Sequence, residues 1–157
     1  MSLKTRKLFG RVLILLIVLT LCFIWGNSLQ SRETSGDISN SLLEIVNRFL
    51  GCVGLELKDD HLLRKFAHFF EFAALGLELY LFAMLRQMKQ TKSFTYILTL
   101  GVCLAVALTD ETIQYFVGRA CRGTDVMLDF CGSLFGVFVL RFLINFFPKL
   151  KNKLNYN

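Results

Sequence analysis

Ionisable side chains that could bind an anion or move a proton lie at the borders of three strongly apolar stretches of this chain. His68 and Glu71 are three residues apart, so on a helix the carboxylate lies one turn from the imidazole and could orient it for acid–base chemistry. Arginines at the same borders could bind a phosphate through paired hydrogen bonds. The candidate site residues are Arg64, Lys65, His68, Glu71, Asp110, Glu111, Gln114, Arg119, Arg122, Asp125 and Asp129. Because an ionisable group in hydrocarbon costs about 2.5–3.5 kcal/mol, such a set indicates a site rather than chance.

Four apolar runs must position these residues, and 54% of the 157 residues are hydrophobic, which is more than a soluble domain usually carries. The runs cover about residues 8–25, 62–85, 94–116 and 126–147, each close to the ~20 residues of a membrane-spanning helix. If the spans alternate in direction, all the charged borders meet at one end. We predict an all-α, polytopic integral membrane four-helix bundle that forms a single domain over residues 1–157.

The segment between the first two runs also has helical periodicity. Ile38, Leu42, Ile45 and Phe49 recur at steps of three and four, with polar residues between them. We predict an amphipathic helix over about residues 38–50, lying on the outer surface or capping the bundle. A plain solvated loop is the alternative.

Three further sequence features bear on how the helices pack and end. Gly132 and Gly136 form a GxxxG pattern on the fourth run and would let another backbone approach closely. Thr124 is a candidate N-cap of that helix, and Pro148 should end it. Glu78 lies about three turns below His68, and we interpret it as structural.

The net charge of +6 comes from basic segments that contain no acidic residue. This asymmetry predicts that both termini are cytoplasmic and that the charged borders open to the cell exterior. The basic excess would contact the inner leaflet and does not indicate nucleic-acid binding. A signal peptide is the alternative for the first run, but the stretch after Leu21 lacks a small-x-small cleavage site, so we expect an uncleaved span. The basic residues are Lys4, Arg6, Lys7, Arg11, Arg86, Lys89, Lys92, Lys149, Lys151 and Lys153.

Metal and cofactor signals in the sequence are weak. The five cysteines include no CxxC pair, and the two histidines form no HExxH motif. Four acids, at Asp110, Glu111, Asp125 and Asp129, could together hold Mg²⁺, Ca²⁺ or Zn²⁺. Arg119 and Arg122 would compete for the same carboxylates, so we expect neither a metal nor a cofactor.

Three blocks of the chain resemble the VanZ-like family of small bacterial membrane proteins. They are RKFAHFFEFAALG at residues 64–76, DETIQYFVGR at 110–119 and DVMLDFCGSLFG at 125–136. A short block at 28–30 shows a weaker similarity. The resemblance implies a multi-pass protein of the bacterial cell membrane. The family's name comes from a member linked to low-level resistance to the glycopeptide teicoplanin.

Three functions fit the charged residues. In the first, the cations bind an anionic lipid or a lipid-linked cell-wall precursor, and we favour this hypothesis. In the second, His68 and Glu71 with the nearby acids make a membrane-embedded hydrolase or transferase acting on such a lipid, for which His68, Glu71, Asp110 and Glu111 are the candidate catalytic residues. In the third, the ions pair with one another and only connect the helices.

Overall fold

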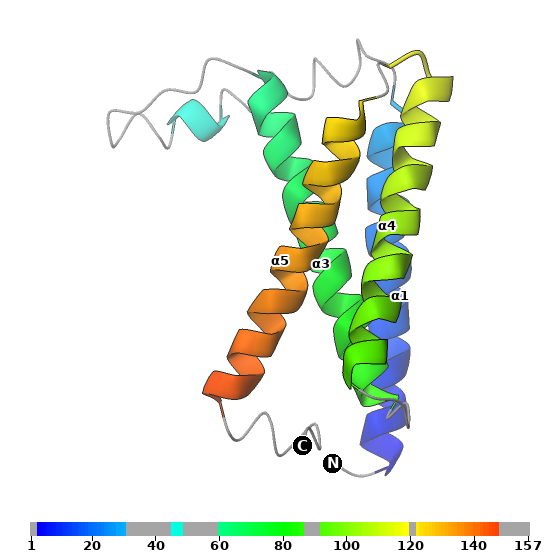
Figure 1. Ribbon diagram of the computed structural model, residues 1–157, viewed down its shortest axis with the longest axis vertical. Coiled ribbons are helices and arrows are strands. Elements are labelled where there is room, and N and C mark those ends of the chain that lie inside the picture. The colour runs from blue at the N-terminus through cyan, green and yellow to red at the C-terminus, as the bar shows by residue number, and fades with distance from the viewer. Residues whose placement is uncertain (1–2, 31–44, 49–59, 87–91, 120–121, 148–157) are drawn as a thin grey trace.

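The computed structural model describes residues 3–30, 45–48, 60–86, 92–119 and 122–147. Within these ranges all regular structure is helical, as predicted (Figure 1). Helix α1 begins and helix α5 ends at the same end of the molecule, as an even number of crossings requires. The long helices are α1 (Leu3–Ser28), α3 (Asp60–Leu85), α4 (Lys92–Phe116) and α5 (Gly123–Phe146).

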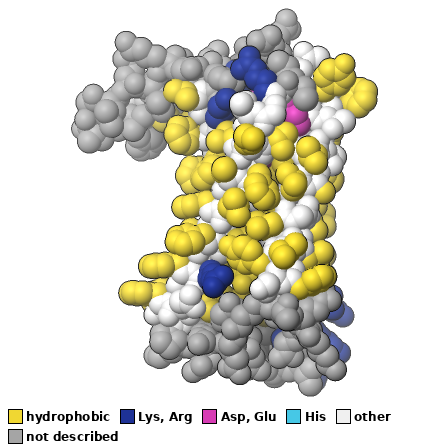
Figure 2. Space-filling model, viewed as in Figure 1, with side chains coloured by type: hydrophobic (Ala, Val, Ile, Leu, Met, Phe, Trp, Pro, Cys, Tyr) yellow, Lys and Arg dark blue, Asp and Glu magenta, His cyan; other side chains and the backbone are white. Residues whose placement is uncertain are grey.

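Each of the four long helices is long and apolar enough to cross a membrane, which confirms the predicted spans. The candidate spans contain 24 or 25 residues, and at 1.5 Å per residue they reach about 36 Å, more than the ~30 Å hydrocarbon core. In Figure 2 hydrophobic side chains cover the middle of the visible face, while Lys and Arg side chains lie toward its two ends. This distribution is that of a bundle surrounded by lipid.

Helix α3 packs against α1, α4 and α5 and makes the most extensive contacts of the four long helices, so it lies at the centre of the bundle. Its closest neighbour is α5, and the glycines explain why. A Cβ atom added at Gly132 or Gly136 would overlap the backbone carbonyl of Phe69 or Ala73 in α3. The predicted close approach of another backbone to this GxxxG pattern is therefore confirmed.

Fully buried apolar residues lie next to the polar residues of α3. Phe72 and Leu75 pack with Ile24 of α1 and Ala107 of α4, all at zero exposure. A second apolar cluster fills the bundle toward its other end, around Tyr80, Leu140 and other residues. A buried apolar layer therefore lies directly below the polar end of the bundle and holds the helices in place there.

The extra helix between α1 and α3 is present as a short helix over residues 45–48 (Figure 1). Ile45 is exposed there, whereas Val46 and Asn47 are half-buried. The rest of the amphipathic helix expected over about residues 38–50 lies outside the described residues.

The ends of α5 follow local chemistry, with one difference from the sequence prediction. Phe147, which precedes Pro148, is extended (φ −108°, ψ 92°), as the steric demand of a following proline requires. At the other end the N-cap is Arg122 and not Thr124, because the helix already begins at Gly123. The Thr124 hydroxyl instead contacts Asp125 Oδ1 at 3.4 Å. The Thr124 prediction was therefore wrong by two residues.

The turn after α4 is built by backbone hydrogen bonds. Gly118 has φ +80°, which a residue without a Cβ adopts easily. The Gly118 N–H donates to Tyr115 O at 3.1 Å, and the Arg119 N–H donates to Gln114 O at 3.0 Å. This turn directs the chain from α4 back toward α5 and sets Arg119 at the end of the bundle.

Candidate functional site

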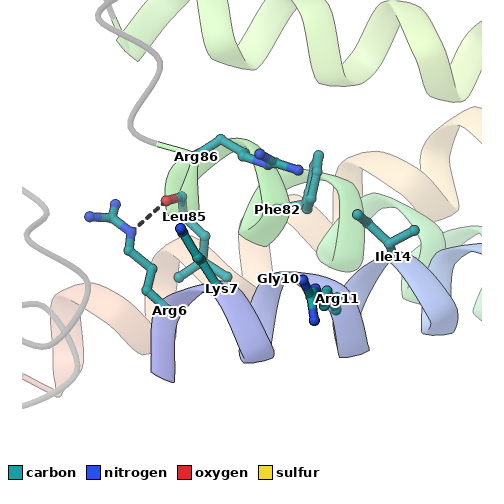
Figure 3. Close-up of a pocket in the computed structure, with 8 residues that line it drawn as sticks. All are labelled: Arg6, Lys7, Gly10, Arg11, Ile14, Phe82, Leu85 and Arg86. Atoms are coloured by element: carbon teal, nitrogen blue, oxygen red, sulfur yellow. Dashed lines mark hydrogen bonds between the residues drawn. The ribbon is translucent and has the colours of Figure 1, made fainter. Parts of the chain in front are cut away.

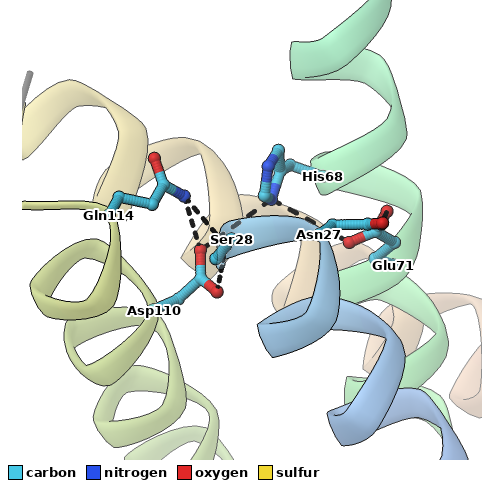
Figure 4. A network of polar contacts seen from close by, with 6 residues as sticks. All are labelled: Asn27, Ser28, His68, Glu71, Asp110 and Gln114. Atoms are coloured by element: carbon cyan, nitrogen blue, oxygen red, sulfur yellow. Dashed lines mark hydrogen bonds and ion pairs between the residues drawn. The ribbon is translucent and has the colours of Figure 1, made fainter. Parts of the chain in front are cut away.

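Among the described residues, Asp110 of α4 is the most deeply buried ionisable residue at this end, with 0% exposure. The Ser28 hydroxyl donates to its Oδ1 at 2.6 Å, and Gln114 Nε2 donates to its Oδ2 at 2.7 Å (Figure 4). Gln114 Nε2 also donates to Ser28 Oγ at 3.2 Å. The end of α1 and one turn of α4 therefore hold both oxygens of Asp110 in a fixed orientation.

His68 of α3 lies between two carboxylates. Its Nδ1 is 3.9 Å from Glu71 Oε2 and 4.0 Å from Asp110 Oδ2, and its side chain is 15% exposed. The other oxygen of Glu71 accepts a hydrogen bond from Asn27 Nδ2 at 2.9 Å (Figure 4). The one-turn spacing seen in the sequence thus places the imidazole beside Glu71, and the tertiary structure adds Asp110 on a neighbouring helix.

Asp129 of α5 completes a three-helix cluster with His68 and Asp110. Asp129 is 3% exposed, and one ligand atom from each of the three residues lies within 4.8 Å of the others. Asp110 and Asp129 are each about 9 Å along their helices from the nearer end, at 1.5 Å per residue. These three residues, which we call the inner cluster, could hold a metal ion.

Glu111 follows Asp110 in the chain but has a different role. It is buried, and its Oε1 accepts a hydrogen bond from the backbone N–H of Arg122. The contact ties the end of α4 to the start of α5 across the turn. Glu111 and Asp110 point to different partners, as their offset of about 100° on a helix requires.

The cations form a separate layer nearer the end of the bundle. Lys65 Nζ lies 3.1 Å from Asp125 Oδ1, and Arg122 is exposed. Arg64 and Arg119 are half-buried. Burial lowers the pKa of the Arg119 guanidinium, and the charge of Arg64 lowers this pKa further, while nearby acids oppose the shift. An arginine stays protonated through such a shift, so two like charges lie near each other here.

Glu78 lies apart from this end of the bundle. Its Oε1 accepts a hydrogen bond from Thr20 at 3.2 Å, which joins α3 to α1 within the span. This contact gives Glu78 a structural partner, in line with its interpretation from the sequence.

A basic pocket of about 470 Å³ lies at the opposite end of the molecule, between α1 and α3 (Figure 3). Arg6 Nε donates to Leu85 O at 2.8 Å, and the Arg86 guanidinium lies 5.2 Å from the Phe82 ring centroid. None of the candidate site residues lines this pocket. The segments that the charge asymmetry predicts to be cytoplasmic supply its basic residues, Arg6, Lys7, Arg11 and Arg86.

The family model described as VanZ/LLP1 matches residues 10–145, which include all the candidate site residues and nearly all of the four long helices. The chain belongs to the VanZ/LLP1 family. It is a multi-pass membrane protein of that family, as the resemblance of its three sequence blocks predicted. Neither the comparison with curated proteins nor that with solved structures gave a match.

Two residues of this VanZ/LLP1 site were not among the sequence-based candidates. Asn27 and Ser28 end α1 and hydrogen-bond to Glu71 and Asp110, respectively. The available signal was the pair of amide and hydroxyl side chains directly after an apolar run, the second of which begins the short block at 28–30. That signal was weak, because polar residues commonly follow a membrane span.

Proposed function

We propose that this VanZ/LLP1 protein binds the phosphate of an anionic lipid or of a lipid-linked cell-wall precursor at the end of the bundle that carries the cations. The observation that supports this most is that two half-buried arginines, Arg64 and Arg119, lie at this end of the bundle and that the charge of Arg64 acts on Arg119. Like charges in a partly desolvated position repel, and a phosphate that accepts paired hydrogen bonds from both would relieve that repulsion.

The surrounding ion pairs leave Arg119 suited to this role. Lys65 forms an ion pair with Asp125, and Glu111 accepts a hydrogen bond from the backbone N–H of Arg122. Within the part of the chain that the structure describes, the Arg119 side chain has no carboxylate oxygen within 4.0 Å. The nearby acids Asp110, Glu111 and Asp125 partly compensate its positive charge at longer range.

Binding can be tested with the purified protein in nanodiscs of a zwitterionic lipid. We would add phosphatidylglycerol or a polyprenyl diphosphate and count bound molecules by native mass spectrometry. Hydrogen bonds to a charged group contribute about 1.5–3 kcal/mol, so Arg119→Ala should weaken binding by roughly 10–100-fold. Arg141→Ala, an exposed arginine near the other end of α5, is the matched control and should bind normally. Equal binding by Arg119→Ala and the unsubstituted protein would refute the proposal.

A second function, hydrolysis or transfer at the phosphate of such a lipid, is favoured by the position of His68. The imidazole has a carboxylate on two sides, so it is oriented and could exchange a proton with a bound substrate. Release of inorganic phosphate from a polyprenyl diphosphate, measured with the same nanodiscs, would distinguish this function from binding alone.

The proposal extends to glycopeptide susceptibility, since a protein that holds a lipid-linked cell-wall precursor could change how much of it a glycopeptide reaches. Deleting the gene should then alter the teicoplanin concentration that inhibits growth. Complementation with the original gene should restore it, and complementation with Arg119→Ala should not. An unchanged inhibitory concentration in the deletion strain would refute this extension without affecting the binding proposal.

A further inference from the structure

We propose that His68, Asp110 and Asp129 bind a divalent transition-metal ion in the interior of the bundle. This inference goes beyond the proposed phosphate binding and does not depend on it. One nitrogen and two carboxylate groups come together from α3, α4 and α5, with their ligand atoms within 4.8 Å of one another. Both carboxylate residues are almost completely buried, at 0% and 3% exposure.

The distances around His68 suit ligands of a shared ion better than hydrogen bonds. Its Nδ1 is 3.9 Å from Glu71 Oε2 and 4.0 Å from Asp110 Oδ2, and a hydrogen bond would need about 3 Å. Two ligand atoms that are each about 2.1 Å from a metal lie about 3.4 Å apart in a tetrahedral arrangement, and about 4.2 Å apart when opposite. Both observed separations lie within that range.

Glu71 supplies an independent observation that points to a ligand. Its side chain is only 10% exposed, and its Oε2 faces the imidazole. Among the described residues neither this oxygen nor His68 Nδ1 has a hydrogen-bond partner, although both atoms are buried. An unsatisfied buried polar atom costs about 1–3 kcal/mol. A cation bound to His68 Nδ1 would satisfy that nitrogen, and its charge would stabilise the neighbouring Glu71 carboxylate.

Hydrogen bonds behind the carboxylates already hold them in place. Ser28 and Gln114 donate to Asp110, and Asn27 donates to Glu71 Oε1, which leaves Oε2 directed at His68. Such partners behind metal ligands orient them and raise the affinity for the ion. A bound divalent cation would also compensate the negative charge of the three buried carboxylates that lie around the imidazole.

The donor set indicates which ion would bind. Calcium and magnesium prefer oxygen ligands alone, whereas one imidazole with carboxylates suits Zn²⁺ or Mn²⁺. The competition for carboxylates that we expected from Arg119 and Arg122 does not occur at these residues. Within the described part of the chain, neither arginine has a side-chain ion pair with Asp110 or Asp129. The inference therefore departs from our sequence-based expectation that no metal is present.

Metal binding can be tested on the full chain in an uncharged, phosphate-free detergent, with any polyhistidine tag removed. After treatment with EDTA, the protein would be titrated with Zn²⁺ or Mn²⁺, dialysed and measured by elemental mass spectrometry. We expect one ion per chain. His68→Gln and Asp129→Asn, both close in volume to the original residues, should each weaken binding at least 10-fold, as the loss of even an outer partner of a ligand typically does.

The matched control is Glu78→Gln, which removes a half-buried carboxylate in the same helix that is hydrogen-bonded to Thr20 and lies outside the inner cluster. It should bind metal like the unsubstituted protein. Retention of the ion by both His68→Gln and Asp129→Asn would overturn the proposal. If those variants fail to fold, the unsubstituted protein still tests the proposal. The proposal would be overturned if that protein retained no metal and its melting temperature did not rise with Zn²⁺ or Mn²⁺.

Discussion

The Lys65 ammonium lies 3.1 Å from the Asp125 carboxylate and joins the start of α3 to the start of α5. The two side chains are 32% and 24% exposed, so water screens the pair. An ion pair in such a setting contributes only about 0–1 kcal/mol to stability. The charged residues at this end of the bundle therefore divide into an outer layer that contributes little to stability and an inner layer, with Asp110 and Asp129, that is largely buried.

Ala substitutions should reveal these two layers. Asp125→Ala should lower the free energy of unfolding by less than about 1 kcal/mol. Asp110→Ala should lower it by roughly 2–4 kcal/mol, because it leaves the Ser28 hydroxyl without its acceptor in the interior and removes one of the two acceptors of the Gln114 amide. Thermal melting in detergent would measure both. Equal losses would contradict the division into layers.

The closeness of α3 and α5 predicts opposite effects for two Gly→Ala changes. Gly136→Ala should destabilise the protein by roughly 1–3 kcal/mol, because the new Cβ overlaps the backbone carbonyl of Ala73, which cannot rotate away. Gly101→Ala is the control, since nothing lies within 4 Å of a Cβ there. That change should be neutral or stabilise helix α4 by about 0.5–1 kcal/mol. Melting temperatures that fall equally in both variants would refute the packing argument.

For lipid binding by the arginines, we expect the geometry of the donor group to matter more than its charge. Arg119→Lys keeps the charge but loses the planar, bidentate donor, so binding of phosphatidylglycerol or a polyprenyl diphosphate should weaken about 10-fold or more. Arg122 is exposed, so Arg122→Ala should remain folded and weaken binding by only about 2–5-fold. Native mass spectrometry of the same nanodiscs would compare them. Full binding by Arg119→Lys would indicate that charge alone is recognised.

His68→Gln separates binding from catalysis. If the site only binds a headgroup, the glutamine amide still donates a hydrogen bond, and much of the lipid affinity should remain. If the site is catalytic, loss of the imidazole, which exchanges a proton, should reduce turnover by about 10²–10⁴-fold. Glu71→Gln is the companion variant, because it removes the charge beside Nδ1 with little change in volume. Intact lipid binding with complete loss of phosphate release in His68→Gln would establish the hydrolase.

Topology can be checked with single cysteines in a cysteine-free background. From the distribution of basic residues, Ser35→Cys and Gly123→Cys should react with a membrane-impermeant maleimide added outside, and Gln90→Cys should react only after the cells are opened. Reaction of Gln90→Cys in intact cells would place the charged end of the bundle inside the cell and redirect the proposed lipid binding to the inner leaflet.

Much of this protein follows from its sequence, because helix length and hydropathy are local properties. Each apolar run is long enough to cross hydrocarbon, and a chain in lipid must satisfy its backbone hydrogen bonds internally, so four helices were predictable. The position of Glu71 one turn from His68 and the small-residue pattern at Gly132 and Gly136 follow from the helical period in the same way.

The contacts between helices were decided only by the tertiary structure. The helical period places residues on one stripe, but the rotation of each helix about its axis and the crossing of α3 with α5 depend on how all the side chains pack together. That packing brings His68, Asp110 and Asp129 together, sets Ser28 and Asn27 behind two of the carboxylates, and pairs Asp125 with Lys65. It also directs Glu111 to the backbone of Arg122, a contact that no side-chain pattern in the sequence could indicate.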